Sequence, residues 1–242
     1  GLQALGYPCP KNYPKLVLPQ SVPPNIGSAR EHLLETFPTE KICMLDDDLQ
    51  FAVRREDDPT KFRAPGILDL IEMFKRIESM LDEFGLVGVA AREGANRNTE
   101  EYQVAARQMR VQAINAPIYH KLCIRYDRME LMEDFDVILQ YLEKGYPNLV
   151  LNYWVTNQGG SNVSGGCSTY RTLERQAAAA EQLAKFHPNF VKTVIKSTKT
   201  SWGGQERKDV RVQWRRAYAA GRARLLDKGK GVSTPPKRIG ST

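Results

Sequence analysis

Short runs of consecutive apolar residues alternate along this chain with stretches in which apolar residues recur every three or four positions. The consecutive runs predict buried strands at 41–45, 86–91, 148–155 and 190–195. The three- and four-residue spacing predicts amphipathic helices at 67–84, 137–142 and 170–186. Because strands and helices alternate, we expect an α/β fold in which a mixed, mainly parallel sheet is flanked by helices.

Weaker signals lie between these segments. Ser28 and Glu31 have the spacing of a capping box and predict a helix that opens there. Ile124–Tyr126 is a candidate short strand. Since no internal repeat or linker interrupts the pattern, we expect one domain over residues 1–228 and a flexible basic tail over 229–242.

The predicted strand at 41–45 ends in three consecutive carboxylates, Asp46, Asp47 and Asp48. Side chains alternate along an extended backbone, so Asp46 and Asp48 share one face with Cα atoms about 7 Å apart, while Asp47 points to the other. Two carboxylates at this spacing could share one Mg²⁺ or Mn²⁺, which would take further ligands from substrate phosphates. The alternative is a solvated acidic turn after a strand.

Charged side chains also stand at the ends of predicted helices. Glu133 and Asp134 precede the helix at 137–142, where the helix dipole stabilises acids; alternatively, one of them could act as a general base. Arg30 lies in a first helical turn, which the dipole disfavours unless an anion binds, and could equally be an exposed surface arginine. His187 is either a metal ligand or a histidine that caps a helix.

Two polar loops follow predicted strands. Arg92, Asn96 and Arg97 come after the strand at 86–91 and would face the ligand if that strand runs parallel to the first. Gly165 and Gly166 belong to a glycine-rich segment that could form a mobile lid or an acceptor loop. Both loops are candidate donor contacts.

The composition is that of an ordinary globular protein, with 242 residues, 41% hydrophobic and 26% charged. No apolar run approaches the ~18 residues of a membrane span, and no signal peptide is recognisable, so we expect a cytoplasmic protein without membrane contact. Its four cysteines and three histidines are scattered, which argues against structural zinc and a disulfide framework. No glycine-rich phosphate loop is present, so a metal would have to help hold any bound phosphates.

The net charge of +7 is unevenly distributed. From Lys196 to the end, 13 Lys and Arg face 3 Asp and Glu, a net charge of +10. A basic surface with interspersed aromatic rings, here Trp202, Trp214 and Tyr218, suits contacts with a nucleic-acid backbone. The candidate DNA-binding residues are Arg207, Lys208, Arg211, Arg215 and Arg216. The alternative is a solvated basic face followed by a tail.

The order of these motifs resembles a known plan. A helix with an early arginine, a strand that ends in Asp-Asp-Asp, and Glu-Asp before a later helix resemble GT-A glycosyltransferases. The finer pattern is similar to the TET-associated glycosyltransferases of bacteriophages over roughly residues 26–219. The motifs are Met44–Leu49, Arg54, Met132–Asp136, Leu139, Gly145–Asn148, Gly165–Ser168, Tyr170–Arg171, His187–Pro188 and Val212–Trp214.

The resemblance implies a metal-dependent transfer of a sugar from a UDP-sugar to 5-hydroxymethylcytosine in double-stranded phage DNA. It implies a donor site that includes Arg30 at the diphosphate, with Asp46 and Asp47 beside the nucleotide-sugar. Asp46 and Asp48 would hold Mn²⁺ or Mg²⁺, and Asp134 would act as the base if the anomeric centre inverts. His187 and the segment at 165–168 would complete the donor side or gate the acceptor.

Other functions stay open at this point. The same fold could use a protein, a glycan or a small molecule as acceptor. A non-catalytic DNA-binding relative would bind DNA without a nucleotide-sugar, and a metal nuclease would cut DNA without a sugar donor. Sugar identity, anomeric outcome and oligomeric state do not follow from the sequence.

Overall fold

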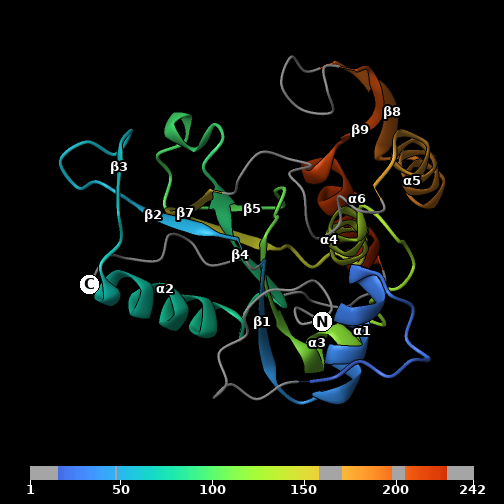
Figure 1. Cartoon of the computed structure of the whole chain (residues 1–242), viewed down its shortest axis with the longest axis horizontal. Coiled ribbons are helices and arrows are strands. Elements are labelled where there is room, and N and C mark those ends of the chain that lie inside the picture. The colour runs from blue at the N-terminus through green and yellow to red at the C-terminus, as the bar shows by residue number, and fades with distance from the viewer. Residues whose placement is uncertain (1–15, 47, 158–170, 198–204, 228–242) are drawn as a thin grey trace.

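The computed structural model of the chain (Figure 1) describes residues 16–46, 48–157, 171–197 and 205–227. The predicted tail at 229–242 lies outside the described residues. So do three predicted donor contacts, Asp47, Gly165 and Gly166.

One seven-stranded sheet forms the centre of the fold. Its strands are β1 (Lys41–Leu45), β2 (Gln50–Arg54), β3 (Phe62–Arg63), β4 (Leu86–Ala91), β5 (Tyr102–Val104), β6 (Val111–Asn115) and β7 (Leu149–Asn157). They are ordered β1-β6-β4-β7-β2-β3, and β5 pairs with β7. Among the described strands β4 and β7 are the one parallel pair. The mixed α/β fold is confirmed, but the prediction of a mainly parallel sheet is wrong.

The strands β1, β4 and β7 nevertheless run in the same direction. Strand β6 lies between β1 and β4 and is antiparallel to both, while β4 and β7 are parallel. Their carboxyl ends therefore meet at one edge of the sheet. Strands β6 and β2 begin at that edge, because Val111 pairs with Leu45 and Gln50 pairs with Asn157. Asp46 and Arg92 thus emerge on the same side, as the sequence predicts.

Helices cover both faces of this sheet. They are α1 (Ile26–Thr36), α2 (Ile67–Met80), α3 (Ala116–Lys121), α4 (Glu133–Glu143), α5 (Leu173–Phe186) and α6 (Trp214–Asp227), with a 3₁₀ turn, η2 (Ala95–Arg97). Helix α1 begins earlier than predicted, because the Asn25 side chain accepts a hydrogen bond from the Ser28 N–H at 2.9 Å and caps the helix. Ile124–Tyr126 is not a strand; it belongs to the turn that follows α3.

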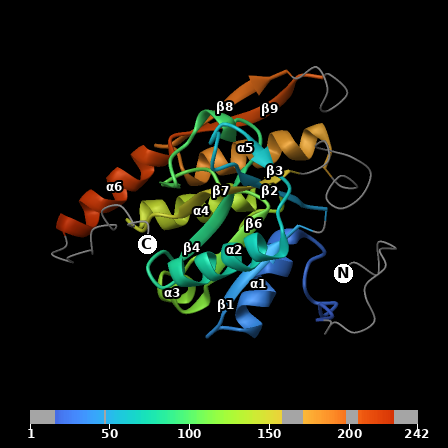
Figure 2. The same cartoon turned by 90° about the vertical axis from the view of Figure 1, so that its left-hand side faces the viewer.

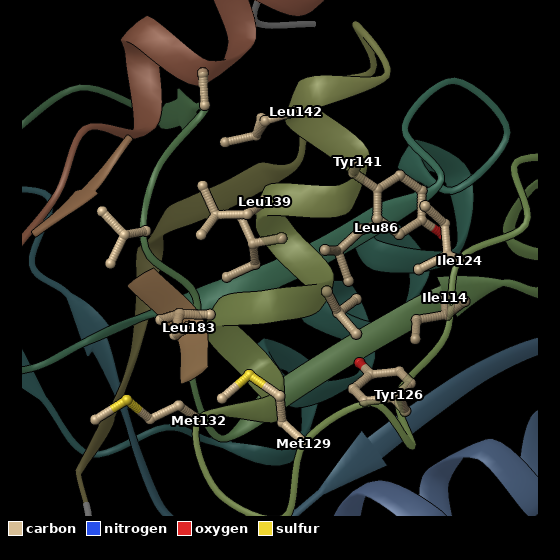
Figure 3. Close-up of a cluster of buried hydrophobic side chains, with 14 of the residues drawn as sticks. Leu86, Ile114, Ile124, Tyr126, Met129, Met132, Leu139, Tyr141, Leu142 and Leu183 are labelled. Atoms are coloured by element: carbon tan, nitrogen blue, oxygen red, sulfur yellow. The ribbon is translucent and has the colours of Figure 1, made fainter. Parts of the chain in front are cut away.

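The helices pack on the sheet in two layers, with α2 on one side and α1, α3 and α4 on the other (Figures 1 and 2). The two-residue period of the strands explains this. Leu86 and Ile114 contribute to the cluster on the α4 side (Figure 3), while their neighbours Val87 and Ala113 contribute to the cluster beneath α2. The sheet therefore has two hydrophobic faces and supports a core on each.

A two-stranded antiparallel sheet, β8 (Val191–Lys196) and β9 (Arg207–Val212), packs against α5. The basic helix α6 follows it and lies against α4. Gly221 permits this approach, because a Cβ there would stand 2.1 Å from the Leu142 carbonyl oxygen. Within the described ranges, no helix has the length and apolarity that crossing a bilayer requires.

Candidate active site

An acidic cluster surrounds Arg30 at the edge where β1, β4 and β7 end. Arg30, on α1, is 8% exposed. Its Nη1 donates to Glu133 Oε1 at 2.8 Å, and its Nη2 lies 3.5 Å from Asp46 Oδ1. The anions beside Arg30 in this structure are therefore side chains of the protein. One guanidinium joins the end of β1 to the start of α4, which lie far apart in the sequence.

The backbone at this edge is unusual. Of the four non-glycine residues with positive φ in the described part of the chain, Arg110 and Met132 both flank the acidic cluster, each at 62°. Met132 is the residue from which α4 starts, so this turn presents Glu133 and Asp134 in the first helical turn. A left-handed conformation costs a non-glycine residue roughly 1–3 kcal/mol, and such residues concentrate at functional sites.

Electrostatic conflict marks the carboxylates of the cluster. Burial and the neighbouring Asp134 charge raise the pKa of Glu133 to about 7, although Arg30 opposes the shift. Burial also raises the pKa of Asp46, and the charges of Asp48 and Asp134 add to that effect. The Arg30 pKa is raised as well: burial alone would lower it, but the surrounding acids outweigh burial. The cluster thus holds more negative charge than its one central cation neutralises.

A buried hydrogen-bond network lies next to Arg30 in the interior of the protein. Its guanidinium lies 5.8 Å from the centre of the Tyr126 ring, and the Tyr126 hydroxyl donates to the Gln112 side chain. Glu31, also on α1, accepts hydrogen bonds from the Tyr126 N–H at 2.7 Å and from the Tyr119 hydroxyl. Burial raises the pKa of Tyr126, so its hydroxyl keeps its proton and can donate.

Arg110 closes the cluster on the other side, and sequence reasoning missed it. It contacts Glu93 at 2.7 Å and donates to the Thr156 carbonyl oxygen at 3.0 Å. Its charge lowers the pKa of Asp46, opposing the burial effect. The contacts of Arg110 connect the start of β6 with the loop after β4 and the end of β7.

Two basic cavities are present among the described residues. The first, of about 370 Å³, contains two residues predicted from the loop after β4, Arg92 and Asn96. The other residues that line it are Arg55, Thr60, Lys61 and Phe62. The second, of about 470 Å³, is lined by Gln103, Ala105, Ala106, Arg107, Gln213, Trp214, Arg215 and Arg216. Arg107 of this second cavity was not a sequence candidate.

The structure does not bring His187 to Asp46 and Asp48. Its Nε2 lies 2.8 Å from Asp136 Oδ1, and its Nδ1 contacts Glu143, so both ring nitrogens are engaged in the interior. The residue also ends α5, which matches the capping alternative. Over the described ranges, no group of three or more His, Cys, Asp and Glu has the arrangement of a self-contained metal site.

The predicted DNA-binding residues fall into two sets. Arg207 pairs with Asp209 at 3.2 Å, and Lys208 pairs with Glu181, so acids already compensate these two charges. Arg211, Arg215 and Arg216 are exposed, and the last two line the larger cavity. The structure therefore brings one pair of the predicted cations to a cavity and leaves the others on β9.

Fold and site together define a class of protein, an α/β domain with a cluster of carboxylates at one edge of its sheet and two cavities lined by basic residues. The chain belongs to the TET-associated glycosyltransferase family, because the model of that family matches residues 6–166, or 161 of the 242 residues. The predicted family membership and enzyme class are thereby confirmed.

Two phage proteins share a shorter stretch. The chain is 32% identical over 65 residues to proteins named Beta-glucosyl-HMC-alpha-glucosyl-transferase, from Enterobacteria phage T2 and Enterobacteria phage T6. The stretch covers 27% of this chain and 23% of each relative, so the chain matches about a quarter of their length. No solved structure matches the chain.

Proposed function

We propose that this chain transfers a sugar from a UDP-sugar to the hydroxymethyl group of 5-hydroxymethylcytosine in DNA. The observation that carries the proposal is the meeting of Asp46, Asp48 and Asp134 at one sheet edge, where the charges of the other two acids both act on Asp46. The family supports sugar transfer, and the names of the two phage relatives support hydroxymethylcytosine as the acceptor.

A divalent cation fits the carboxylates after β1. Asp48 and Asp134 raise the pKa of Asp46, a repulsion that a cation beside Asp46 and Asp48 would relieve. Mg²⁺ is commonly held by one or two carboxylates plus substrate phosphates and waters, so a third protein ligand is not required. When bound, Mn²⁺ or Mg²⁺ would neutralise charge on the departing nucleoside diphosphate.

Asp134 is the better candidate for the general base. Glu133 is held by Arg30 at 2.8 Å and is 9% exposed, whereas Asp134 is only half-buried. In the reaction, the bond between the anomeric carbon and the diphosphate oxygen breaks while the hydroxymethyl oxygen bonds to that carbon. The hydroxymethyl proton passes to the Asp134 carboxylate, and the electron pair of the broken bond leaves with the diphosphate.

The smaller cavity suits the anionic donor. Arg92, Arg55 and Lys61 line it without an acid among the lining residues, and Arg92 follows β4 at the same edge as Asp46. Arg30 is buried and bonded to Glu133 and Asp46, so we propose that it holds these two carboxylates in place and that other cations contact the diphosphate. We therefore assign the donor phosphates to Arg92 and the carboxylate-bound cation.

The test is transfer to a modified duplex. The protein is incubated with hydroxymethylcytosine-containing duplex DNA, Mn²⁺ and a panel of UDP-sugars, and the digested nucleosides are weighed by mass spectrometry. We expect a sugar-sized mass gain that is lost in Asp48→Ala and kept in Asp82→Ala. The second variant is a control that removes an exposed carboxylate paired with Lys41, at the opposite end of β1. Transfer by Asp48→Ala at the wild-type rate would contradict the metal assignment, and no gain with any donor would contradict the acceptor.

A further inference from the structure

The larger cavity has the composition of a nucleotide site. It is built from the segment after β5 and from the residues that open α6. Three arginines line it, Arg107, Arg215 and Arg216, and none of the lining residues is acidic. Its volume of about 470 Å³ falls within the range of small-ligand pockets.

Aromatic rings connect this cavity to the helical turn that carries Asp134, the proposed general base. Trp214, which lines the cavity, lies 5.5 Å from Phe135 between ring centres. The Arg107 guanidinium stands 4.7 Å from the centre of the same Phe135 ring. Phe135 follows Asp134 in the first turn of α4, and the Arg107 charge also acts on Glu93, the partner of Arg110, so the cavity borders the acidic edge.

The polar side chains of the cavity can address both parts of a nucleotide. Arginines supply charge for the phosphates on either side of a base. The Gln213 amide also lines the cavity; its oxygen accepts a hydrogen bond from Arg216 Nη1 at 2.9 Å, and its N–H groups are donors suited to a base edge. Indole and guanidinium planes are the surfaces on which unpaired bases stack in proteins.

We propose that this cavity holds the acceptor pyrimidine after it has left the duplex stack, with the base against Trp214 and Arg107 and the flanking phosphates on Arg215 and Arg216. The inference rests on the proposed DNA acceptor and deepens it. Asp134 is half-buried in the first turn of α4, and enzymes that act on a base in a duplex reach it by turning the base out of the stack. Extrusion costs less when the base is mismatched.

Binding to matched and mismatched duplexes tests this site without sugar transfer. One duplex carries hydroxymethylcytosine opposite guanine, and the other carries it opposite adenine. We expect the wild-type protein to bind the mismatched duplex on the order of 10-fold more tightly, because the cost of unpairing falls. Pyrrolo-cytosine at the target position should also brighten on binding, because its fluorescence rises when the base unstacks.

Variants assign the effect to the cavity. Trp214→Ala and Arg107→Gln should each reduce the mismatch preference to about 2-fold or less and weaken the fluorescence rise, whereas Trp214→Phe should retain both. Because Trp214 also packs against the core, Arg107→Gln keeps the test valid if Trp214→Ala fails to fold. Arg224→Gln, an exposed arginine in the last turn of α6 that does not line the cavity, is the matched control and should keep the wild-type preference.

The two proposals fail in distinguishable ways. If the wild-type protein glycosylates the duplex but shows neither a mismatch preference nor brightening, the extruded-base site is wrong and the acceptor assignment stands. An unchanged preference in a folded Arg107→Gln and Trp214→Ala would also overturn the site. If the protein neither binds nor modifies any duplex, both proposals are wrong.

Discussion

Helix α4 carries two groups of acids, one at the edge of the sheet and one in the interior, and their surroundings differ. At its first turn, Glu133 and Asp134 join Asp46 around the buried Arg30 at the sheet edge, with Arg110 on the other side. Further along the helix, Asp136 is fully buried and is contacted by His187, Gln140 and Arg128. The same helix therefore displays one acidic group at the sheet edge, where burial and neighbouring acids raise carboxylate pKa values, and one in the interior that is held by a histidine, an amide and an arginine.

The interior group shows what complete compensation requires. Asp136 receives hydrogen bonds from His187 at 2.8 Å and from Gln140 at 2.7 Å, and Arg128 lies 3.3 Å away. Glu143 engages the other ring nitrogen of His187. Asp136 is thus fully buried among its partners, whereas burial, together with the charges of neighbouring acids, raises the pKa values of Glu133 and Asp46 at the edge. The comparison teaches that acids on one helix need their surroundings to be interpreted, and that the acids with raised pKa values are the better candidates for a site.

The largest expected effect comes from the edge. Asp134→Asn removes the proposed proton acceptor with little change in shape, so the transfer rate should fall by roughly 10²–10⁴-fold. Thermal unfolding should stay within a few degrees of wild type, because Asp134 is only half-buried. Single-turnover transfer measures the first quantity and a melting curve the second. A stable variant that transfers sugar at the wild-type rate would remove Asp134 from the mechanism.

The interior group should respond in the opposite way. Asp136→Ala leaves His187 and Arg128 without their shared carboxylate, and breaking a buried pair from one side costs about 3–5 kcal/mol of unfolding free energy. Urea denaturation measures this loss. Asp127→Ala, an exposed acid paired with Arg125, is the control and should cost about 1 kcal/mol or less. Equal losses in the two variants would mean that burial does not distinguish the groups.

Local patterns were enough to predict much of the fold. The strands β1, β4, β7 and β8 and the helices α2, α4 and α5 follow from apolar spacing, which is a property of a few neighbouring residues. The position of β6, antiparallel between β1 and β4, does not follow from apolar spacing, because strand order depends on contacts between distant segments. Arg110 was missed for a related reason: the region around it has no clear periodicity, and its partners Glu93 and Thr156 adjoin it only in the folded chain.

The site was partly predictable on the same grounds. Asp46 and Asp48 follow a recognisable strand, and Glu133 and Asp134 open a recognisable helix, so their positions could be inferred. The environment of His187 could not, because its two carboxylate partners lie 51 and 44 residues away in sequence. A lone histidine carries no signal that separates a ligand from an internal bridge.

The two acidic groups should also differ in the pH range over which their contributions to the free energy of unfolding are lost. Burial raises the Glu133 pKa from its ordinary 4.5 to about 7 in the folded chain, so the folded state keeps a proton that the unfolded state has already lost between these values. Stability contributed by Glu133 is therefore full below pH 4.5 and falls as pH rises to about 7.

The His187 pKa is also raised above its ordinary 6.5, because its hydrogen bonds to Asp136 and Glu143 outweigh burial, which alone would lower it. Its contribution is present below pH 6.5 and is lost as pH rises through the folded value, so the edge responds first.

Glu133→Gln should remove the decline between pH 4.5 and 7, on the order of 2 kcal/mol, and leave the later decline intact. Urea denaturation across pH 4.5–8.5 measures both, with the exposed Glu83→Gln as a control that should follow wild type. Parallel curves for wild type and Glu133→Gln would show that the edge carries no more strain than the interior.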